Sequence, residues 1–372
     1  MDLELSEEQM TLRDNFRAVL ADCCAPPFVR SIYEAGDQGD AVWKQMTELG
    51  WPALAVPESA GGLGYGFVEL GLLAEELGRA AAPATLLATA TQLTPALVAA
   101  GAEETLAAVA EGRLKGSLAL AENGRWTPHD VRTQASPQGD DWLLQGSKQA
   151  VLAGSSADVF AVVARDASAG EPGLFLVEAE RTRRATTRSI DPGLLLADVT
   201  FEATPARALI LPGEQARVAL AGIAEQAAVA MALQGVGACR RIFEMTLEYA
   251  KVRKQYDRVI GSFQALKHRF ADLYLAVERA TALCYLAAVS IAEGDPDRTS
   301  SAHVAKAALG DCQRLVAEDG LQLHGGLGFT WEQDLHFWLK RAKASELLCG
   351  SSAWHRAALV PMLGLDHSEE RP

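Results

Sequence analysis

Two short segments of the sequence combine residue types that can hold phosphate groups. The first, residues 253–258, reads Arg-Lys-Gln-Tyr-Asp-Arg and is followed by Phe263 and Gln264. A basic connector between two helices can offer guanidinium and backbone N–H groups to a phosphate, and an aromatic ring beside it suits an adenine–ribose arm. The same pattern also suits a solvated helix end at which Arg compensates the helix dipole. Spacing alone leaves both interpretations open.

The second segment, residues 322–329, reads Gln-Leu-His-Gly-Gly-Leu-Gly-Phe. Paired glycines after a helix permit positive φ and a close approach of the backbone to a ligand. The segment lacks the preceding strand of a dinucleotide-binding turn and the Lys-Ser/Thr of a phosphate-binding loop. Taken alone it is typical of a helix C-cap, and we expect His324 to be structural rather than catalytic.

Composition limits the classes of function. Apolar residues make up 49% of the chain and charged residues 22%, as in soluble globular proteins. The net charge of −14 disfavours a nucleic-acid surface, and no apolar run reaches the roughly 20 residues that span a bilayer. The N-terminus has no basic export leader, and the only close cysteines, Cys23 and Cys24, lack metal-ligand spacing. We expect a reduced, cytoplasmic protein without a metal.

The residue pattern changes twice along the chain, which predicts three domains. Residues 1–115 form the first, a helical domain, and Ser6 with Gln9 has capping-box spacing at its start. Residues 116–212 form a small β domain, with short β-like runs at 117–121, 142–144, 159–164, 174–177 and 199–201. Residues 213–372 form a helical domain with segments near 215–255, 263–293, 298–322 and 333–363.

This α–β–α order and a series of motifs resemble the acyl-CoA dehydrogenase family over nearly the whole chain. Residues 5–9 resemble the family's opening helix, and residues 49–64 resemble a loop of its first domain. Residues 75–78 match the helix that follows, and the segments around 253–264 and 322–328 match the family's cofactor motifs. The resemblance implies an α+β multidomain fold: an N-terminal helical domain, a central small antiparallel β-barrel and a C-terminal four-helix bundle.

The resemblance also implies a flavin cofactor shared between subunits. In the family, the ADP half of FAD is held by the subunit next to the one that holds the isoalloxazine ring. The residues implied to contact FAD in this chain are Arg253, Tyr256, Gln264, Gln322, Gly325, Gly326, Gly350 and Ser351. A subunit partner, either a paralogue or a second copy in a dimer or tetramer, would then complete the site.

The sequence departs from the family where the chemistry takes place. Most members carry a Glu before a Gly-Thr/Ser pair as the base, and here Cys349 precedes Gly350 and Ser351. A thiol has a reference pKa of about 8.5, and leucines precede this one. A displaced base could be Glu225 or Glu346, although a surface or ion-pairing role is the simpler interpretation for both carboxylates.

The flavin-ring side departs as well. In the β domain, Ala150 stands where the family has a stacking Trp, and Leu152 replaces the hydroxyl residue that contacts flavin N5. The resemblance therefore favours the non-catalytic subunit of an α2β2 heterotetramer of bacterial steroid or bulky acyl-CoA degradation. Acyl-CoA would be the substrate and electron-transfer flavoprotein the acceptor. A homo-oligomeric dehydrogenase with a displaced base and a scaffold without a redox role are the alternatives.

Overall fold

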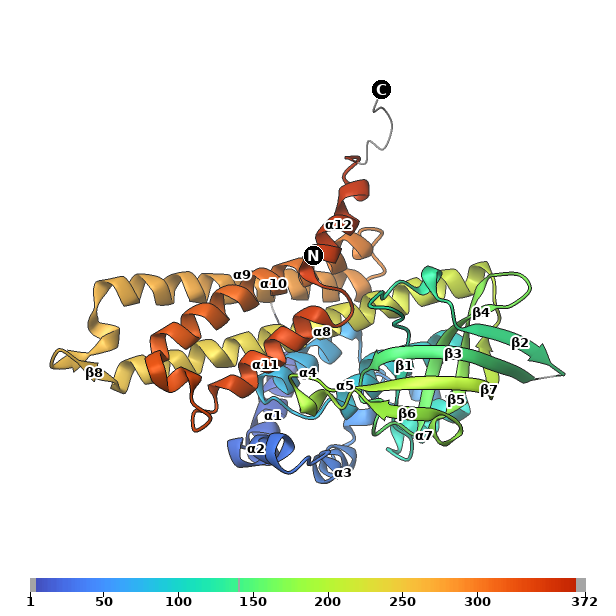
Figure 1. Ribbon diagram of the computed structural model, residues 1–372, viewed down its shortest axis with the longest axis horizontal. Helices are drawn as coiled ribbons and strands as arrows, with labels where there is room; N and C mark the ends of the chain where they lie inside the picture. The colour runs from blue at the N-terminus through green and yellow to red at the C-terminus, as the bar shows by residue number, and fades with distance from the viewer. Residues whose placement is uncertain (1–4, 140, 366–372) are drawn as a thin grey trace. The chain divides into compact units, whose positions relative to one another are not determined.

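A computed structural model describes residues 5–139 and 141–365 (Figure 1). The chain folds into two compact units, each assembled from separate segments of sequence. Among the described residues, the helical unit contains those of segments 5–30, 71–81 and 228–365, and the barrel unit contains those of 31–70, 82–139 and 141–227. Helices α4 (Phe67–Arg79) and α8 (Glu214–Val252) contribute residues to both units. The division into three domains at residues 116 and 213 therefore stays a prediction.

The helical unit is a bundle in which α8, α9 and α10 run side by side (Figure 1). Its remaining long elements follow in chain order. They are α1 (Glu7–Cys23), α2 (Pro26–Glu34, which continues into the barrel unit), α9 (Gln264–Ala292), α10 (Arg298–His324), the 3-10 helix η8 (Gly325–Phe329), α11 (Leu335–Leu347) and α12 (Ser352–Met362). The predicted capping box is confirmed, because the Ser6 and Gln9 side chains each accept the backbone N–H of the other residue. The predicted C-terminal helical bundle is confirmed too.

Two glycines let α4 and α8 approach each other closely. A Cβ at Gly78 would lie 1.8 Å from the Gln234 carbonyl oxygen, and one at Gly237 would lie 1.9 Å from the Glu75 carbonyl oxygen. Because atoms cannot approach so closely, only glycine fits at either position. The helix pair therefore packs backbone against backbone.

The single helix predicted near 333–363 is wrong. It is two helices, α11 and α12, separated by the turn 348–351. Cys349 has φ 58° and Gly350 has φ 97°, which are incompatible with a right-handed helix. A Cβ at Gly350 would lie 2.7 Å from the Trp354 ring and 2.9 Å from His355 Nε2, so the turn needs glycine there.

The barrel unit contains a closed ring of strands. Its strands are β1 (Gly116–Ala119), β2 (Gln134–Gln138), β3 (Asp141–Val151), β4 (Val159–Asp166), β5 (Pro172–Glu178), β6 (Arg183–Thr186) and β7 (Ala197–Ile210). Hydrogen-bonded neighbours run β4–β2–β3–β7–β5 and back to β4. The predicted small β-barrel is confirmed. Its pairings β1–β4 and β2–β4 are parallel, whereas the others in this sheet are antiparallel.

Two strands of the barrel were not predicted, for a physical reason. β2 and β6 have polar sequences, Gln-Ala-Ser-Pro-Gln and Arg-Arg-Ala-Thr, and nearly all their residues are exposed. The barrel interior is filled from other strands, with Phe160, Phe175 and Phe201 fully buried. Further helices complete this unit: α3 (Asp40–Glu48), α5 (Thr85–Ala88), α6 (Thr94–Ala100) and α7 (Glu103–Ala110). Apolar residues of α6 and α7 form a second core with β1 and β4.

Candidate functional site

The basic connector folds as a small exposed hairpin between α8 and α9. Strands β8 (Lys254–Gln255) and β9 (Arg258–Val259) pair antiparallel, and the turn residues Tyr256 and Asp257 have φ of 52° and 61°. Tyr256 is 88% exposed, and its ring lies 6.5 Å from the Phe263 ring. The Arg258 guanidinium lies 5.5 Å from the centre of the same Phe263 ring. The hairpin thus presents cationic and aromatic groups to solvent.

The glycine segment lies at the same end of the bundle as this hairpin. The rings of Tyr249, on the last turn of α8, and His324, at the end of α10, stack 4.5 Å apart. His324 Nδ1 donates to the Gly320 carbonyl oxygen (2.8 Å), and burial lowers the pKa of His324. The packing gives His324 a structural role. It also joins the two segments that the sequence singled out.

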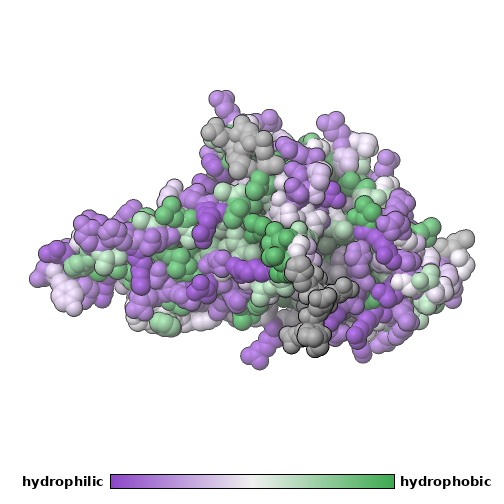
Figure 2. Space-filling model, turned by 90° about the horizontal axis from the view of Figure 1, so that it is seen from above, coloured by the Kyte–Doolittle hydropathy of each residue, from purple (hydrophilic) through white to green (hydrophobic). Residues whose placement is uncertain are grey.

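The backbone after His324 is open to a ligand. Gly325 has φ 61° and ψ −146°, a conformation that is essentially restricted to glycine. A Cβ at Gly325 or Gly326 would meet no atom within 4 Å, and both residues are exposed. This end of the molecule, at the left of Figure 2, has a mostly hydrophilic surface. An open glycine turn beside exposed Arg253, Tyr256 and Gln322 is a donor set that fits the pyrophosphate and adenine of FAD.

Two of the implied cofactor residues lie elsewhere. Gly350 is buried, and Ser351 is the N-cap of α12, where its hydroxyl oxygen accepts the Trp354 N–H (3.3 Å). These residues follow the C-terminal end of α11, whereas η8 precedes its start (Figure 1). The 13 residues of α11 span roughly 20 Å. The structure therefore does not bring Gly350 and Ser351 together with the hairpin cluster.

A buried lysine holds the turn that contains the base position. Lys306 on α10 is fully buried and donates to the carbonyl oxygens of Ser345 (2.7 Å), Glu346 (3.0 Å) and Leu348 (2.6 Å). These carbonyls end α11 and would otherwise lack a helical partner. Burial lowers the pKa of Lys306 to about 8. The sequence did not predict this residue, although a lone Lys within the apolar run 304–309 is a signal for it.

Two histidines hold the same turn from α12 and α10. His355 Nε2 donates to the Cys349 carbonyl oxygen (2.9 Å), and burial lowers the pKa of His355 to about 3. The ring is therefore neutral and its Nδ1 is an acceptor. His303 Nδ1 lies 2.7 Å from that nitrogen and must donate to it. These hydrogen bonds fix the tautomers of both rings.

Glu346, one of the two alternative bases, is fully engaged. Its carboxylate accepts the Ser352 backbone N–H (2.8 Å) and the Lys343 ammonium (2.7 Å). Burial acts to raise the pKa of Glu346, but these hydrogen bonds outweigh burial and leave the pKa below its usual value. This carboxylate caps α12 and is a poor base. The other alternative, Glu225, is half-buried on α8.

The thiol at the base position is itself unsuited to proton abstraction. Cys349 is 8% exposed, and burial raises the pKa of its thiol to about 11. At neutral pH the thiol therefore keeps its proton, and a protonated thiol cannot act as a base. The turn 348–351 is a structural connection built from Lys306, His355 and Glu346.

The barrel segments that the sequence resemblance implies to face flavin are joined by a buried ion pair. Lys148 Nζ lies 2.6 Å from Glu122 Oε1, and the Gln149 N–H donates to the Ala121 carbonyl oxygen (2.8 Å). Burial lowers the pKa of Lys148 to about 8. Ala150, with φ 49°, follows in a bulge of β3. No aromatic ring occupies that position, as the sequence indicates.

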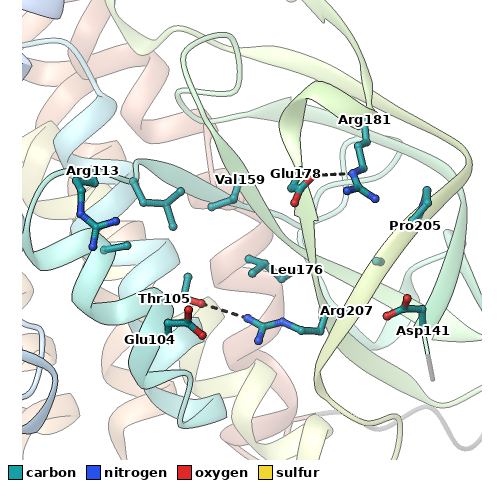
Figure 3. Close-up of a pocket in the computed structure, with 13 residues that line it drawn as sticks. Glu104, Thr105, Arg113, Asp141, Val159, Leu176, Glu178, Arg181, Pro205 and Arg207 are labelled. Atoms are coloured by element: carbon teal, nitrogen blue, oxygen red, sulfur yellow. Dashed lines mark hydrogen bonds and ion pairs between the residues drawn. The ribbon is translucent and has the colours of Figure 1, made fainter.

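The barrel unit also contains an open groove of about 570 Å³, shown in Figure 3. Three guanidinium groups and three carboxylates line it. Arg181 hydrogen-bonds Glu178 (2.5 Å), and Arg207 donates to the Thr105 hydroxyl (3.1 Å). The balanced charges give this groove no net attraction for an anionic cofactor.

Comparison with known proteins identifies the family. Residues 6–116 match the model of the acyl-CoA dehydrogenase N-terminal domain, and residues 216–361 match that of the acyl-CoA dehydrogenase C-terminal domain. The helical segments, barrel and bundle are the architecture of this class. The chain belongs to the acyl-CoA dehydrogenase family.

Individual relatives agree with this assignment. The chain is 33% identical to acyl-CoA dehydrogenase IpdE2 of Mycobacterium tuberculosis over 349 residues, which cover 93% of this chain and 94% of the relative. Among solved structures, it resembles a Tcur3481–Tcur3483 steroid ACAD variant (28% identity, TM-score 0.86, 98% and 99% of the two chains covered). It also resembles the ChsE4–ChsE5 complex of M. tuberculosis (25% identity, TM-score 0.86, 100% of both chains covered).

Helices α8 and α9 are long and apolar enough to span a membrane by length and composition. Within the most apolar stretch of each helix, 56% of the residues in α8 and 39% of those in α9 are buried among the described residues. Helix α9 and nearly all of α8 lie within residues 216–361, which match the acyl-CoA dehydrogenase C-terminal domain. The exposed apolar residues of α9 include Tyr274 and Leu275, which are 50% and 64% exposed.

Proposed function

We propose that this chain is the non-catalytic subunit of a heteromeric, FAD-dependent acyl-CoA dehydrogenase. The observation that carries the proposal is the turn at Cys349. Its thiol is protonated at neutral pH, and Lys306, His355 and Glu346 are engaged in holding the backbone. A base must have a lone pair free to take the substrate α-proton. The protonated Cys349 thiol is too weakly basic for this step, and the Ser351 hydroxyl oxygen already accepts the Trp354 N–H.

The retained part of the site is the nucleotide end. Arg253, Tyr256, Gln264 and Gln322 are exposed there beside the Gly325–Gly326 turn. These groups would hold the ADP half of a FAD whose ring lies in a partner subunit. When bound, FAD accepts the β-hydrogen of the acyl-CoA thioester as a hydride. This chain's own residues would bind the pyrophosphate by charge-assisted hydrogen bonds and orient the cofactor.

The names of two related solved structures support a multi-subunit assembly and a bulky substrate. One solved relative is a steroid ACAD named for two components, and another is a complex of ChsE4 and ChsE5. We place the chain in the cytoplasm, in β-oxidation of a steroid-like or similarly bulky acyl-CoA, as part of a heterotetramer. Electron-transfer flavoprotein is the proposed acceptor. Gly350 and Ser351 would contact a different part of the cofactor from the hairpin cluster.

Expression of the chain alone and with an acyl-CoA dehydrogenase paralogue that has the base Glu tests the proposal. The chain alone should retain little FAD and oxidise no acyl-CoA, and co-expression should restore both. Within the complex, Cys349→Ala should leave turnover unchanged, whereas Arg253→Gln should lower FAD retention. Arg314→Gln, which removes an exposed arginine from the middle of α10, is the matched control for the second variant.

Each alternative predicts a different result. A homo-oligomer with full FAD occupancy and normal turnover would establish a displaced base, and Glu225→Gln would then abolish activity. A scaffold would assemble with the paralogue without raising its affinity for FAD. Loss of turnover in Cys349→Ala would overturn the view that this turn is only structural.

A further inference from the structure

A cavity of about 250 Å³ lies within the helical unit, between α1, the start of α2, the end of α4, α8 and α11. It belongs neither to the hairpin cluster nor to the turn at Cys349. One side is lined by the guanidinium groups of Arg17, Arg79 and Arg241 and by the carboxylate of Glu76. The rest is mainly apolar, from Leu20, Ala21, Ala25, Pro26, Ala80 and Trp338.

The cationic side of this cavity is not fully compensated. Arg17 pairs with Glu76 (2.6 Å), and Arg79 pairs with Glu244 (2.7 Å). Arg241 approaches the same Glu244 carboxylate only to 3.6 Å. Two carboxylates thus pair with three guanidinium groups, and of these carboxylates only Glu76 lines the cavity. This leaves an excess of one positive charge on this side of the cavity.

Arg241 is also preorganised to accept a ligand. Its guanidinium lies 5.7 Å from the centre of the Trp338 ring, and the Trp338 indole N–H donates to the Arg79 carbonyl oxygen (2.7 Å). The ring is therefore fixed, and the cation rests on it. Among the described residues, the five N–H donors of Arg241 make no hydrogen bond. A guanidinium held in place with its donors unused matches a planar carboxylate.

We propose that this cavity binds a small organic monocarboxylate, with its carboxylate on Arg241 and its apolar body against Leu20, Ala80 and Trp338. The single excess charge favours a monoanion, because a phosphate dianion would also face the Glu76 carboxylate. The apolar walls favour an organic acid over an inorganic anion. The volume lies below the range of roughly 300–1,000 Å³ for drug-sized ligands, so the ligand is compact. The inference does not depend on the proposed subunit role.

Binding of benzoate to the full chain, with any subunit that co-purifies, tests this site by calorimetry or ligand-observed NMR. Benzyl alcohol, the neutral analogue, and inorganic phosphate are the comparison probes. Arg241→Gln should weaken benzoate binding about tenfold or more, and Arg241→Lys should weaken it less. Ala21→Leu should also weaken binding, because Ala21 lines the cavity from the exposed side of α1, where a leucine narrows the opening without disturbing the core.

The matched control is Arg314→Gln, which removes an exposed arginine, paired with Glu318, from α10 of the same unit. It should leave benzoate binding unchanged. Absence of saturable benzoate binding, equal binding of benzyl alcohol, or equal loss in Arg314→Gln would overturn the proposal. Unchanged benzoate binding in both Arg241→Gln and Ala21→Leu would overturn it too. Because two variants are used, misfolding of one of them does not decide the test.

Discussion

At the scale of single residues, the turn at 348–351 shows how buried side chains can hold a backbone turn. A carboxylate at position 349 would be buried beside carbonyl oxygens that already receive the Lys306 ammonium. The thiol of Cys349 is small, uncharged and 8% exposed, so it fills the position without needing a counter-charge. The side chains of Lys306, His355 and Glu346 around it form hydrogen bonds with backbone groups of the turn and of the start of α12.

Lys306 should therefore be a stability residue. Lys306→Met leaves the carbonyl oxygens of Ser345, Glu346 and Leu348 without a donor, and we expect the free energy of unfolding to fall by roughly 2–4 kcal/mol. Urea denaturation measures the change. Lys267→Met, at an exposed site of α9, should change stability by less than about 0.5 kcal/mol. Equal stability of the Lys306→Met variant and the parent would contradict the capping role.

His355 should make stability depend on pH in the acidic range. Its pKa is about 3 in the folded chain, against an ordinary value of 6.5, so the unfolded chain binds a proton that the folded chain does not. This contribution is present above about pH 6.5 and is lost progressively as the pH falls toward 3. His355→Asn should be less stable at pH 8, yet lose less stability between pH 7 and 5.

The urea midpoint measured across that pH range checks the prediction. His268→Asn, at an exposed position of α9, should keep the parental pH dependence. A His355→Asn curve parallel to that of the parent would show that another group causes the acid destabilisation.

At the scale of elements, glycine positions decide how helices approach and end. Substituting Gly237 and Gly222, both in α8, distinguishes the effect of steric crowding from that of helix propensity. A Cβ at Gly237 would collide with the Glu75 carbonyl, whereas one at Gly222 would meet no atom within 4 Å. Gly237→Ala should cost about 3 kcal/mol or more, and Gly222→Ala should stabilise by about 0.5–1 kcal/mol. Opposite shifts of the thermal midpoint are the expected readout, and a common direction would contradict the close approach of α4 and α8.

The glycine turn after α10 offers a second matched pair. Neither Gly325 nor Gly326 has a neighbour that a Cβ would touch, but Gly325 has φ 61° and ψ −146°. Gly325→Ala should cost about 1–3 kcal/mol and lower FAD retention in the complex, because the turn must change shape. Gly326→Ala should alter stability by less than about 0.5 kcal/mol. Equal effects in thermal denaturation would show that the Gly325 conformation is not required.

At the scale of the whole molecule, the helical unit leaves apolar side chains uncovered. On α9, Leu275 is 64% exposed and Tyr274 50%; on α12 and just after it, Leu363 is 68% and Met362 48% exposed. Hydrophobic patches are visible on the face shown in Figure 2. Exposed apolar surface of this kind is typical of subunit interfaces.

Leu275→Lys should therefore weaken assembly, because a buried charge without a partner is costly at an interface. Sedimentation of the co-expressed complex should show a shift toward smaller species. Leu49→Lys places the same charge at another exposed leucine, outside the bundle, and should leave assembly intact. Normal assembly of the Leu275→Lys variant would exclude α9 from the subunit contact.

The sequence by itself determined the order of helical and β segments, the start of the first helix, and the absence of a carboxylate at position 349. These features depend on local sequence patterns: the capping box at Ser6, the alternating apolar runs of the strands, and the Cys-Gly-Ser segment at residues 349–351. The strands β2 and β6 could not be predicted, because they are polar and exposed and lack an apolar pattern. The break between α11 and α12 could not be predicted either, because Lys306, which is distant in sequence, holds that turn.

Only the tertiary structure decided how the turn at Cys349 is held. Lys306, His303 and His355 converge on one turn from α10 and α12, and no spacing along the chain predicts that meeting. The uncompensated Arg241 has the same origin, since its partner carboxylate is already held by Arg79 from another helix. Hydrogen bonds and charge balance depend on distances in space, whereas sequence patterns report distances along the chain.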